Sequence, residues 1–216
     1  MKKAVICFTR VPRPGQTKTR LMPVLSGEQC AQLHRAFLQD LNAVYQDLEA
    51  DLLVAYTPDP HWQALQSLLP CGKQFFQQEG DGLGARMHNA LCQAFRWGYE
   101  SVLLTGSDLP ELKKEHLEHA FAVLAQADVV LGPTRDGGYY LVGMKRPCAR
   151  VFEGHKYGGS TVLESTLAAI ADAGLKGALE SDCEDVDTPE DLARLSQTLP
   201  VDSTTGQFLK KAGCWK

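Results

Sequence analysis

The chain has 216 residues, of which 44% are hydrophobic and 22% are charged, and its formal net charge is −4. This composition is typical of one soluble globular domain, and the acidic balance argues against a protein that coats nucleic acid, which usually carries a basic surplus. The apolar run near the N-terminus, residues 4–8, is too short for a signal peptide or a membrane span, so we expect a cytoplasmic protein.

Strands and helices are predicted to alternate along the chain. Short apolar runs predict strands over residues 4–8, 51–57, 73–78, 101–108, 128–134 and 138–144. A helix is predicted to follow the capping-box residue Ser26, and further helices are predicted over residues 61–69, 83–95, 113–127, 160–173 and 188–199. This alternation predicts an α/β fold, a three-layer α/β/α sandwich with a mostly parallel central sheet. We expect one domain over residues 1–200 and a C-terminal tail over residues 201–216.

The spacing of cysteines and histidines argues against several kinds of site. The seven cysteines are far apart and form no CxxC pair or Cys/His cluster. We therefore predict no zinc site and expect reduced thiols. The six histidines show neither metal nor triad spacing, and the G-x-S-x-G elbow of Ser/His/Asp hydrolases is missing.

The first loop after a predicted strand is the basic stretch RVPRPGQTKTRL, residues 10–21. In parallel sheets ligands bind beyond the carboxyl ends of the strands, so this loop is a candidate site. It does not match the phosphate-binding pattern G-x-x-x-x-G-K-[ST], because Thr17 precedes Lys18. Gly15 favours a turn whose N–H groups can face an anion, Lys18 supplies a point charge and Arg20 a bidentate fork. A solvated basic loop is an equally good interpretation of the composition alone.

Aspartates stand at the end of the predicted strand over residues 101–108 and just before the predicted helix over residues 188–199. Asp108 ends the apolar run SVLLTGSD, where a carboxylate loses hydration unless a cation pairs with it. Mg²⁺ is a natural partner, since it takes one or two carboxylates plus substrate phosphates; the alternative is a turn or helix cap. Asp185 and Asp187 stand two apart on an extended piece, from which a second metal carboxylate can come. The alternative, acids that favour a helix N-terminus, explains Asp187 less well because it precedes the Thr188 cap.

Two glycine-rich stretches complete the set of candidate loops. In TRDGGYY, residues 134–140, Asp136 either holds an acceptor group or starts a turn, and the following glycines allow a close backbone approach or the turn itself. In GDGLGAR, residues 80–86, the glycines and Arg86 either lie against a nucleotide or form an ordinary turn before a helix.

The order of these loops resembles a known family. It runs P-x-P-G-x-x-K-T-R-L, G-D-x-L-G-x-R-M, G-S-D-L-P, G-P-x-x-D-G-G-Y-Y-L-V-G and D-V-D-T-P-E-D-L, over about residues 4–195. The chain resembles the bacterial glycosyltransferase-like branch of the nucleotide-diphospho-sugar transferase superfamily, which has the GT-A fold. Its opening loop is also similar to that of the 2-phospholactate guanylyltransferases.

The resemblance implies a role for each matching residue. It implies that the nucleotide is bound by Gly15, Lys18, Arg20, Gly82, Leu83, Gly84, Arg86 and Ser107. It implies that the acceptor is bound by Asp136, Gly137, Gly138 and Tyr139. It also implies that Asp108 and Asp187 bind Mg²⁺ or Mn²⁺, and that Lys18, Arg20 and Asp108 are catalytic. Whether Asp185 joins the metal site stays open.

The chain also departs from the family pattern, which leaves the reaction open. It lacks the G-G-x-G-x-R loop of sugar nucleotidylyltransferases and the D-x-D of many glycosyltransferases, and Tyr157-Gly158 stands where Trp-Ser is frequent. The favoured hypothesis is nucleotidyl transfer from a nucleoside triphosphate to a small phosphorylated acceptor, with release of pyrophosphate. The alternatives are glycosyl transfer from a nucleotide-sugar and a non-catalytic nucleotide-binding regulatory protein. We expect no nucleic-acid partner, and the sequence is compatible with a monomer and with a homodimer.

Overall fold

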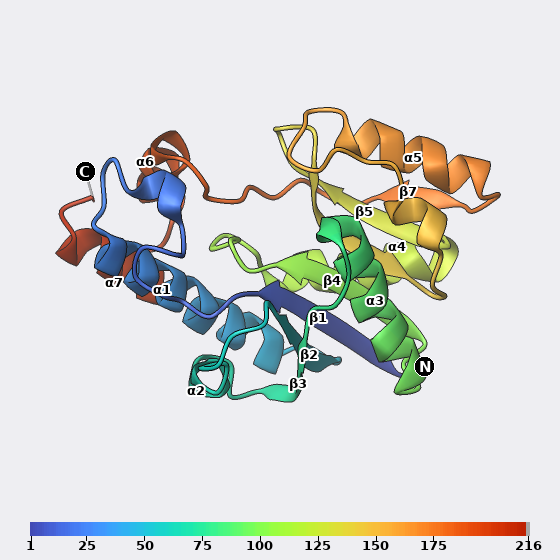
Figure 1. Ribbon diagram of the computed structural model, residues 1–216, viewed down its shortest axis with the longest axis horizontal. Helices are drawn as coiled ribbons and strands as arrows, with labels where there is room; N and C mark the ends of the chain where they lie inside the picture. The colour runs from blue at the N-terminus through green and yellow to red at the C-terminus, as the bar shows by residue number, and fades with distance from the viewer. Residues whose placement is uncertain (215–216) are drawn as a thin grey trace.

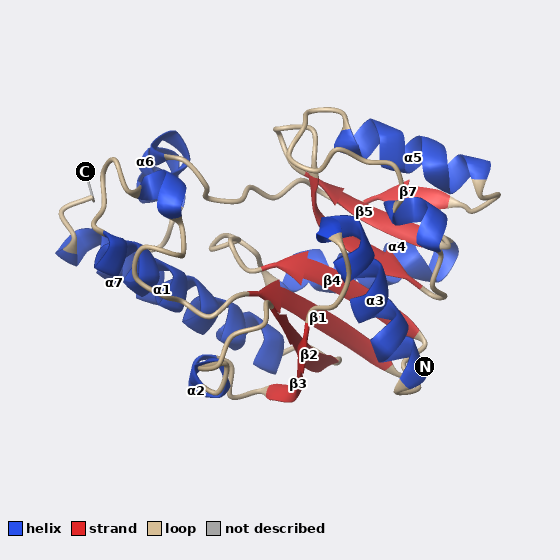
Figure 2. Cartoon of the chain, in the orientation of Figure 1, coloured by secondary structure: helices blue, strands red, loops and turns tan. Residues whose placement is uncertain are grey.

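Seven strands form one central sheet in the computed structural model, which describes residues 1–214 (Figures 1 and 2). They are β1 (Lys3–Thr9), β2 (Asp51–Tyr56), β3 (Gly72–Gln77), β4 (Ser101–Gly106), β5 (Val129–Pro133), β6 (Tyr139–Met144) and β7 (Gly177–Leu179). Their order in the sheet is β3-β2-β1-β4-β6-β5-β7. Neighbouring strands are parallel except in the two pairs that include β6, which runs antiparallel to β4 and to β5. The prediction of a mostly parallel sheet is confirmed.

Helices cover both faces of this sheet. They are α1 (Gly27–Gln46), α2 (Ala64–Leu68), α3 (Gly82–Arg96), α4 (Lys114–Gln126), α5 (Val162–Asp172), α6 (Pro189–Thr198) and α7 (Thr204–Lys211), with short 3-10 turns at Thr19–Leu21 and Ala149–Phe152. Figure 1 shows α3 and α5 in front of the strands and α4 behind them. The predicted three-layer sandwich is therefore confirmed.

The side chains of β1 show how one apolar strand serves two layers. Successive side chains of a strand point to opposite faces, so a strand that is apolar at every position is buried on both sides. Val5 and Cys7 belong to the core cluster that includes residues of α1 and α4, whereas Ala4 and Ile6 belong to the cluster that includes residues of α3 and α5. The continuous run AVICF is thus explained by burial on both faces.

A third core cluster joins the C-terminal helices to the N-terminal part of α1. It contains Leu21, Phe37, Leu192 and Leu209, each almost fully buried. Two predicted helix starts lie at this end of the molecule, and both are confirmed: the capping box at Ser26 for α1, and the cap at Thr188 for α6, which the structure shows to be a capping box with Asp191. These caps fix where each helix begins, and hence where the preceding loops end.

Two elements have no counterpart among the predicted ones. The strand β7 is only three residues long, too short for a periodic signal. The helix α7 lies within the segment expected to be a tail, and its first turn is anchored because the Asp40 carboxylate accepts hydrogen bonds from the backbone N–H groups of Thr204 (2.8 Å) and Thr205 (2.9 Å). Over residues 1–214, no helix has the length and apolar character needed to cross a bilayer.

Candidate functional site

Two adjoining cavities lie at the carboxyl ends of β1 and β4. One, here called the basic cavity, has a volume of about 460 Å³, and its polar lining includes Thr9, Arg10, Lys18, Arg20, Gln78, Arg86 and Ser107. The other, the aromatic cavity, has a volume of about 340 Å³, and its lining includes Phe8, Tyr139, Tyr140, Tyr157, Asp136 and Asp185. Both cavities are lined by Phe8, Arg20, Leu83, Gly106, Asp108 and Asp187. The two cavities therefore adjoin at these shared residues.

An extended segment, residues 180–188, brings distant aspartates to this edge of the sheet. It follows β7 and passes the carboxyl ends of β5 and β4, as the orange-red trace between β7 and α6 shows in Figure 1. The N–H of Glu180 donates to the carbonyl of Leu131 (2.8 Å), and the N–H of Val186 donates to the carbonyl of Asp108 (3.0 Å). Because Asp187 follows Val186, its carboxylate reaches the same Lys18 ammonium as that of Asp108, even though the two aspartates are far apart in sequence.

Lys18 lies between the two aspartates. Its ammonium Nζ is 2.9 Å from Asp108 Oδ1, 3.0 Å from Asp187 Oδ1 and 2.5 Å from the carbonyl oxygen of Val186. The Lys18 side chain is only 3% exposed. Its backbone is left-handed, with φ 53°, and it is the one non-glycine residue with positive φ among residues 1–214. A side chain normally disfavours that conformation, so a non-glycine residue held there points to a functional constraint.

Arg20 marks the boundary between the two cavities. Its Nη1 is 3.4 Å from Asp187 Oδ2, but the side chain is 74% exposed. A guanidinium in this position is free to turn toward an anion in either cavity, and its planar fork matches phosphate oxygens.

The pKa values of Asp108 and Asp185 are shifted in opposite directions. Burial acts to raise the pKa of Asp108, but Lys18, together with His34 and Arg10, outweighs it, so the pKa lies below its ordinary value. Burial, reinforced by the nearby charges of Asp187 and Asp136, raises the pKa of Asp185 to about 6. The charges of Asp187 and Asp136 thus act on Asp185 in the same direction as its burial, while the Lys18 ammonium opposes them.

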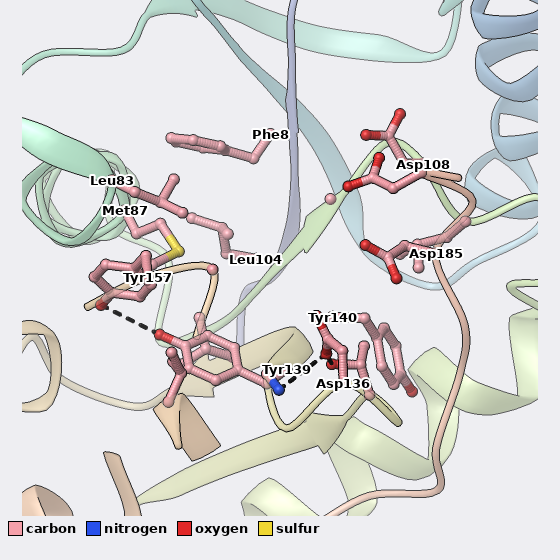
Figure 3. Close-up of a pocket in the computed structure, with 18 of the residues that line it drawn as sticks. Phe8, Leu83, Met87, Leu104, Asp108, Asp136, Tyr139, Tyr140, Tyr157 and Asp185 are labelled. Carbon is pink, nitrogen blue, oxygen red and sulfur yellow. Dashed lines mark hydrogen bonds between the residues drawn. The ribbon is translucent and has the colours of Figure 1, made fainter. Parts of the chain in front are cut away.

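Figure 3 shows the aromatic cavity with the Asp108 and Asp185 carboxylates on one side and Phe8, Leu83 and Met87 on another. The hydroxyl of Tyr139 donates to that of Tyr157 at 3.4 Å, which ties β6 to the loop before α5. Rings and carboxylates that face one space can contact both the apolar and the polar parts of a small molecule.

A buried network under the basic cavity was not singled out from the sequence. His34, on α1 and 1% exposed, has its Nε2 3.0 Å from Ser107 Oγ and 3.8 Å from Asp108 Oδ1. Thr9 Oγ1 donates to the same Ser107 oxygen at 2.9 Å. Burial lowers the pKa of His34 to about 4, so the ring is neutral at pH 7. One signal could have indicated this network: His34 lies among the buried residues of α1, and a buried histidine usually has a polar partner.

Gln78, just beyond β3, was also missed. Its amide Nε2 donates to the carbonyls of Thr9 (2.9 Å) and Ala55 (3.0 Å), which joins the carboxyl ends of β1 and β2. No motif marks this residue, because its role depends on strand neighbours that only the folded sheet provides.

The structure brings most of the predicted site residues together. The basic cavity is lined by the predicted residues Lys18, Arg20, Leu83, Arg86, Ser107, Asp108 and Asp187. The aromatic cavity is lined by the predicted acceptor residues Asp136, Gly138 and Tyr139, and also by Asp185. The nucleotide and acceptor residues expected from the motifs thus separate into two neighbouring spaces.

Four predicted glycines lie outside both linings: Gly15, Gly82, Gly84 and Gly137. Gly82 and Gly84 line a third cavity on the other side of the α3 N-terminus. A Cβ on Gly84 would overlap the carbonyl of Phe152, and one on Gly137, where φ is +86°, would overlap the carbonyl of Ser160. Gly84 and Gly137 therefore permit close packing of the surrounding loops.

The oxygen atoms of this site meet part of what a divalent metal ion needs. Within residues 1–214, no three His, Cys, Asp or Glu side chains are arranged as a ready metal site. Asp108 and Asp187 nevertheless lie on either side of one ammonium, and Mg²⁺ commonly takes two carboxylates with substrate phosphates as the remaining ligands. The residues fit a metal ion that binds together with a polyphosphate.

Comparison with protein families and curated sequences finds similar proteins. A family model described as "Uncharacterized protein conserved in bacteria (DUF2064)" matches residues 27–159. The phosphoenolpyruvate guanylyltransferase of Sphaerobacter thermophilus is 25% identical over 205 residues, which cover 94% of this chain and 97% of that protein. A 2-phospho-L-lactate guanylyltransferase of a Methanocaldococcus species is 27% identical over 210 residues, which cover 91% of this chain and 82% of that protein.

Solved structures show the same architecture. A protein from Desulfovibrio desulfuricans G20, given the provisional description of a nucleotide-diphospho-sugar transferase, is 34% identical, has a TM-score of 0.91, and the match covers 99% of this chain and 96% of that one. The CMP:2-keto-3-deoxy-manno-octonic acid synthetase complexed with CTP is 12% identical with a TM-score of 0.56, and the match covers 90% of this chain and 97% of that one. The second likeness concerns the fold alone.

Proposed function

The chain belongs to the DUF2064 family of bacterial proteins, and from this premise and the geometry of its two cavities we propose that it is a nucleotidyltransferase. It transfers a nucleotidyl group from a nucleoside triphosphate to a small phosphorylated acceptor and releases pyrophosphate. The guanylyltransferases among its relatives make GTP the first donor to test.

The observation that supports this proposal most strongly is the junction between the basic and the aromatic cavity. Two substrates can bind side by side, one in each cavity, and Arg20, Asp108 and Asp187 line both. The basic cavity offers four cationic side chains, which suits a triphosphate, while the aromatic cavity suits a small organic group. Holding two reactants in adjoining cavities removes most of the entropic cost of bringing them together.

The chemical step requires little from the protein beyond orientation and charge. An oxygen of the acceptor phosphate attacks the α-phosphorus, its bond to that phosphorus forms, and the bond to the bridging oxygen of pyrophosphate breaks. The negative charge that grows on the departing pyrophosphate is stabilised by Lys18 and Arg20. A phosphate nucleophile is already ionised at pH 7, so no general base is needed, which is consistent with His34, whose pKa of about 4 makes it a weak base.

Asp108 and Asp187 are the residues that would hold Mg²⁺ or Mn²⁺, and the ion would neutralise phosphate charge. Asp185 adds a third carboxylate on the same edge of the aromatic cavity. Lys18, Arg20 and Arg86, which line the basic cavity, orient the phosphates.

Glycosyl transfer from a nucleotide-sugar is the second candidate. The tyrosine rings and carboxylates of the aromatic cavity favour it, since aromatic rings pack on sugar faces and carboxylates accept hydrogen bonds from hydroxyls. The many cations around the basic cavity favour nucleotidyl transfer, in which pyrophosphate leaves.

The two candidates predict different ligand panels in a thermal-shift assay. For nucleotidyl transfer, GTP or another nucleoside triphosphate with Mg²⁺ raises the unfolding temperature, and pyrophosphate is released when an acceptor phosphate is added. Stabilisation by UDP-sugars or GDP-sugars but by no triphosphate would contradict nucleotidyl transfer. Asp108→Asn is expected to abolish metal-dependent binding, and unchanged binding in this variant would refute the site.

A further inference from the structure

The ammonium of Lys18 fills an oxygen cage. Its three hydrogen-bond donors are matched by three acceptors, Asp108 Oδ1, Asp187 Oδ1 and the carbonyl oxygen of Val186, at 2.5–3.0 Å. Two carboxylates and a carbonyl are the oxygen ligands that a hard divalent cation also prefers. In this conformation a side-chain cation therefore occupies the position that a metal ion would need.

Several contacts hold Lys18 in this place. The side chain is 3% exposed, and its ammonium lies 5.6 Å from the ring centroid of Phe37 on α1. Its backbone is left-handed, and its side chain lies inward from the opening loop. The neighbouring Arg20 meets only Asp187, and from an exposed position, so Lys18 is the principal counterion of the carboxylate pair.

A divalent ion and the Lys18 ammonium cannot share this cage. Two positive charges a few ångströms apart repel strongly where water is largely excluded. The ammonium can leave the cage only if it finds other anions, because its removal from the carboxylates would otherwise leave it unpaired. Lys18 lines the basic cavity, where the phosphates of a nucleotide would offer such anions.

The geometry points to Lys18 as an internal counterion that occupies the metal position in the nucleotide-free protein, so that a divalent ion binds only together with the nucleotide. The triphosphate draws the ammonium out of the cage, and the ion enters between Asp108 and Asp187. This inference rests on the proposed function, because it requires a nucleotide in the basic cavity.

The test measures binding of Mn²⁺ itself, by electron paramagnetic resonance of the free ion, in protein stripped with a chelator. The wild-type protein is expected to bind Mn²⁺ at least tenfold more weakly alone than with GTP. Lys18→Met removes the ammonium at nearly constant length and is expected to bind Mn²⁺ alone at least tenfold more tightly than the wild type. Mn²⁺ alone should also raise the unfolding temperature of this variant more than that of the wild type.

Two further variants separate the cage from general effects of charge. Lys73→Met breaks a similar ion pair, Lys73 Nζ to Asp51 Oδ2 at 2.7 Å, far from the cavities, and should leave Mn²⁺ binding unchanged. Lys18→Met combined with Asp187→Asn restores the charge balance and should lose the gain in Mn²⁺ affinity. If Lys18→Met folds poorly, the comparison of Mn²⁺ binding by the wild type alone and with GTP still tests the inference.

Two results would overturn the inference: tight binding of Mn²⁺ alone by the wild type, or no gain in affinity in Lys18→Met. Either result leaves nucleotidyl transfer intact if GTP still binds and pyrophosphate is still released. If no triphosphate binds to any variant, with or without Mn²⁺, the proposed function itself fails.

Discussion

The capping box of α6 positions a residue of the candidate metal site, and replacement of Asp191 by alanine tests this link. Asp191 Oδ2 accepts hydrogen bonds from the backbone N–H groups of Asp187 (3.1 Å) and Thr188 (2.8 Å) and from the Thr188 hydroxyl (2.8 Å). Its Oδ1 pairs with Arg194 at 2.7 Å. The side chain is only 18% exposed, so water replaces these contacts incompletely after Asp191→Ala.

The expected loss of stability follows from the hydrogen bonds removed. A hydrogen bond to a charged acceptor contributes about 1.5–3 kcal/mol, and loss of a helix cap costs about 1 kcal/mol. These contributions overlap, and Arg194 keeps its partner Glu184 at 2.8 Å, so we expect a total of about 2–3 kcal/mol. For a protein of this size that corresponds to a fall in unfolding temperature of roughly 5–10 °C.

The loss should also depend on pH, with a defined sign. Burial acts to raise the pKa of Asp191, but the hydrogen bonds from Thr188 and Asp187 and the charge of Arg194 outweigh it, so the folded-state pKa lies below its ordinary value. A depressed pKa contributes stability above the unfolded-state pKa, near 4, and loses that contribution as pH falls through the folded-state pKa. The difference between wild type and Asp191→Ala should therefore be full at pH 7 and shrink toward pH 3.

Urea unfolding followed by circular dichroism at several pH values measures this difference. Asp202→Ala is a suitable control, because the exposed Asp202 carboxylate makes no hydrogen bond or ion pair within the described part of the chain. A second measurement, the affinity for Mn²⁺ in the presence of GTP, should weaken in Asp191→Ala because Asp187 loses its backbone support. A stability difference below about 0.5 kcal/mol, or one that persists unchanged at low pH, would refute the reasoning.

Three further predictions concern charge and backbone at the site. In metal-free protein, Asp185→Asn should raise the free energy of unfolding by about 1–2 kcal/mol at pH 8, because a folded-state pKa near 6 makes the wild type lose stability as pH rises from about 4 to 6. A gain equally large at pH 4 in urea unfolding would contradict this. Arg20→Met should lower kcat by about 10²–10³-fold with an unchanged unfolding temperature. The control is Arg13→Met, which should retain turnover because the Arg13 guanidinium pairs outside both cavities, and equal losses of pyrophosphate release in the two variants would remove Arg20 from the mechanism. Gly137→Ala should lower the free energy of unfolding, measured in urea, by at least about 3 kcal/mol, because a Cβ there overlaps a backbone carbonyl. Gly158 has the same φ of +86° but open space around it, so Gly158→Ala should cost about 1–2 kcal/mol, and similar costs for the two variants would show that the overlap is relieved.

The elements of the fold could be predicted from local sequence because their signals are local. The apolar run of β1 and the capping boxes at Ser26 and Thr188 depend on residues a few positions apart, and the structure contains all three. The alternation of strands and helices was sufficient for a three-layer sandwich. The short β7 and the helix α7 escaped because their formation depends on partners far away in sequence, the neighbouring strand β5 and the carboxylate of Asp40.

The candidate site divides in the same way. The residue types were apparent from the sequence: cations in the opening loop, Asp108 after an apolar strand, and Asp187 before a helix cap. For the opening loop and Asp108 the sequence also predicted a position at one edge of the sheet, because the carboxyl ends of parallel strands share an edge. Composition alone left open whether the basic loop was a site, since it does not distinguish a solvated loop from an anion site.

Only the tertiary structure decided how these residues meet. The segment 180–188 crosses the strand ends and brings Asp187 to Asp108, and the left-handed backbone of Lys18 directs its ammonium between them. It also placed the buried His34 beneath Ser107, a contact that no spacing along α1 predicts. The physical reason is range: periodicity and capping act over a few residues, whereas a site is made by contacts between segments that only the completed sheet holds together.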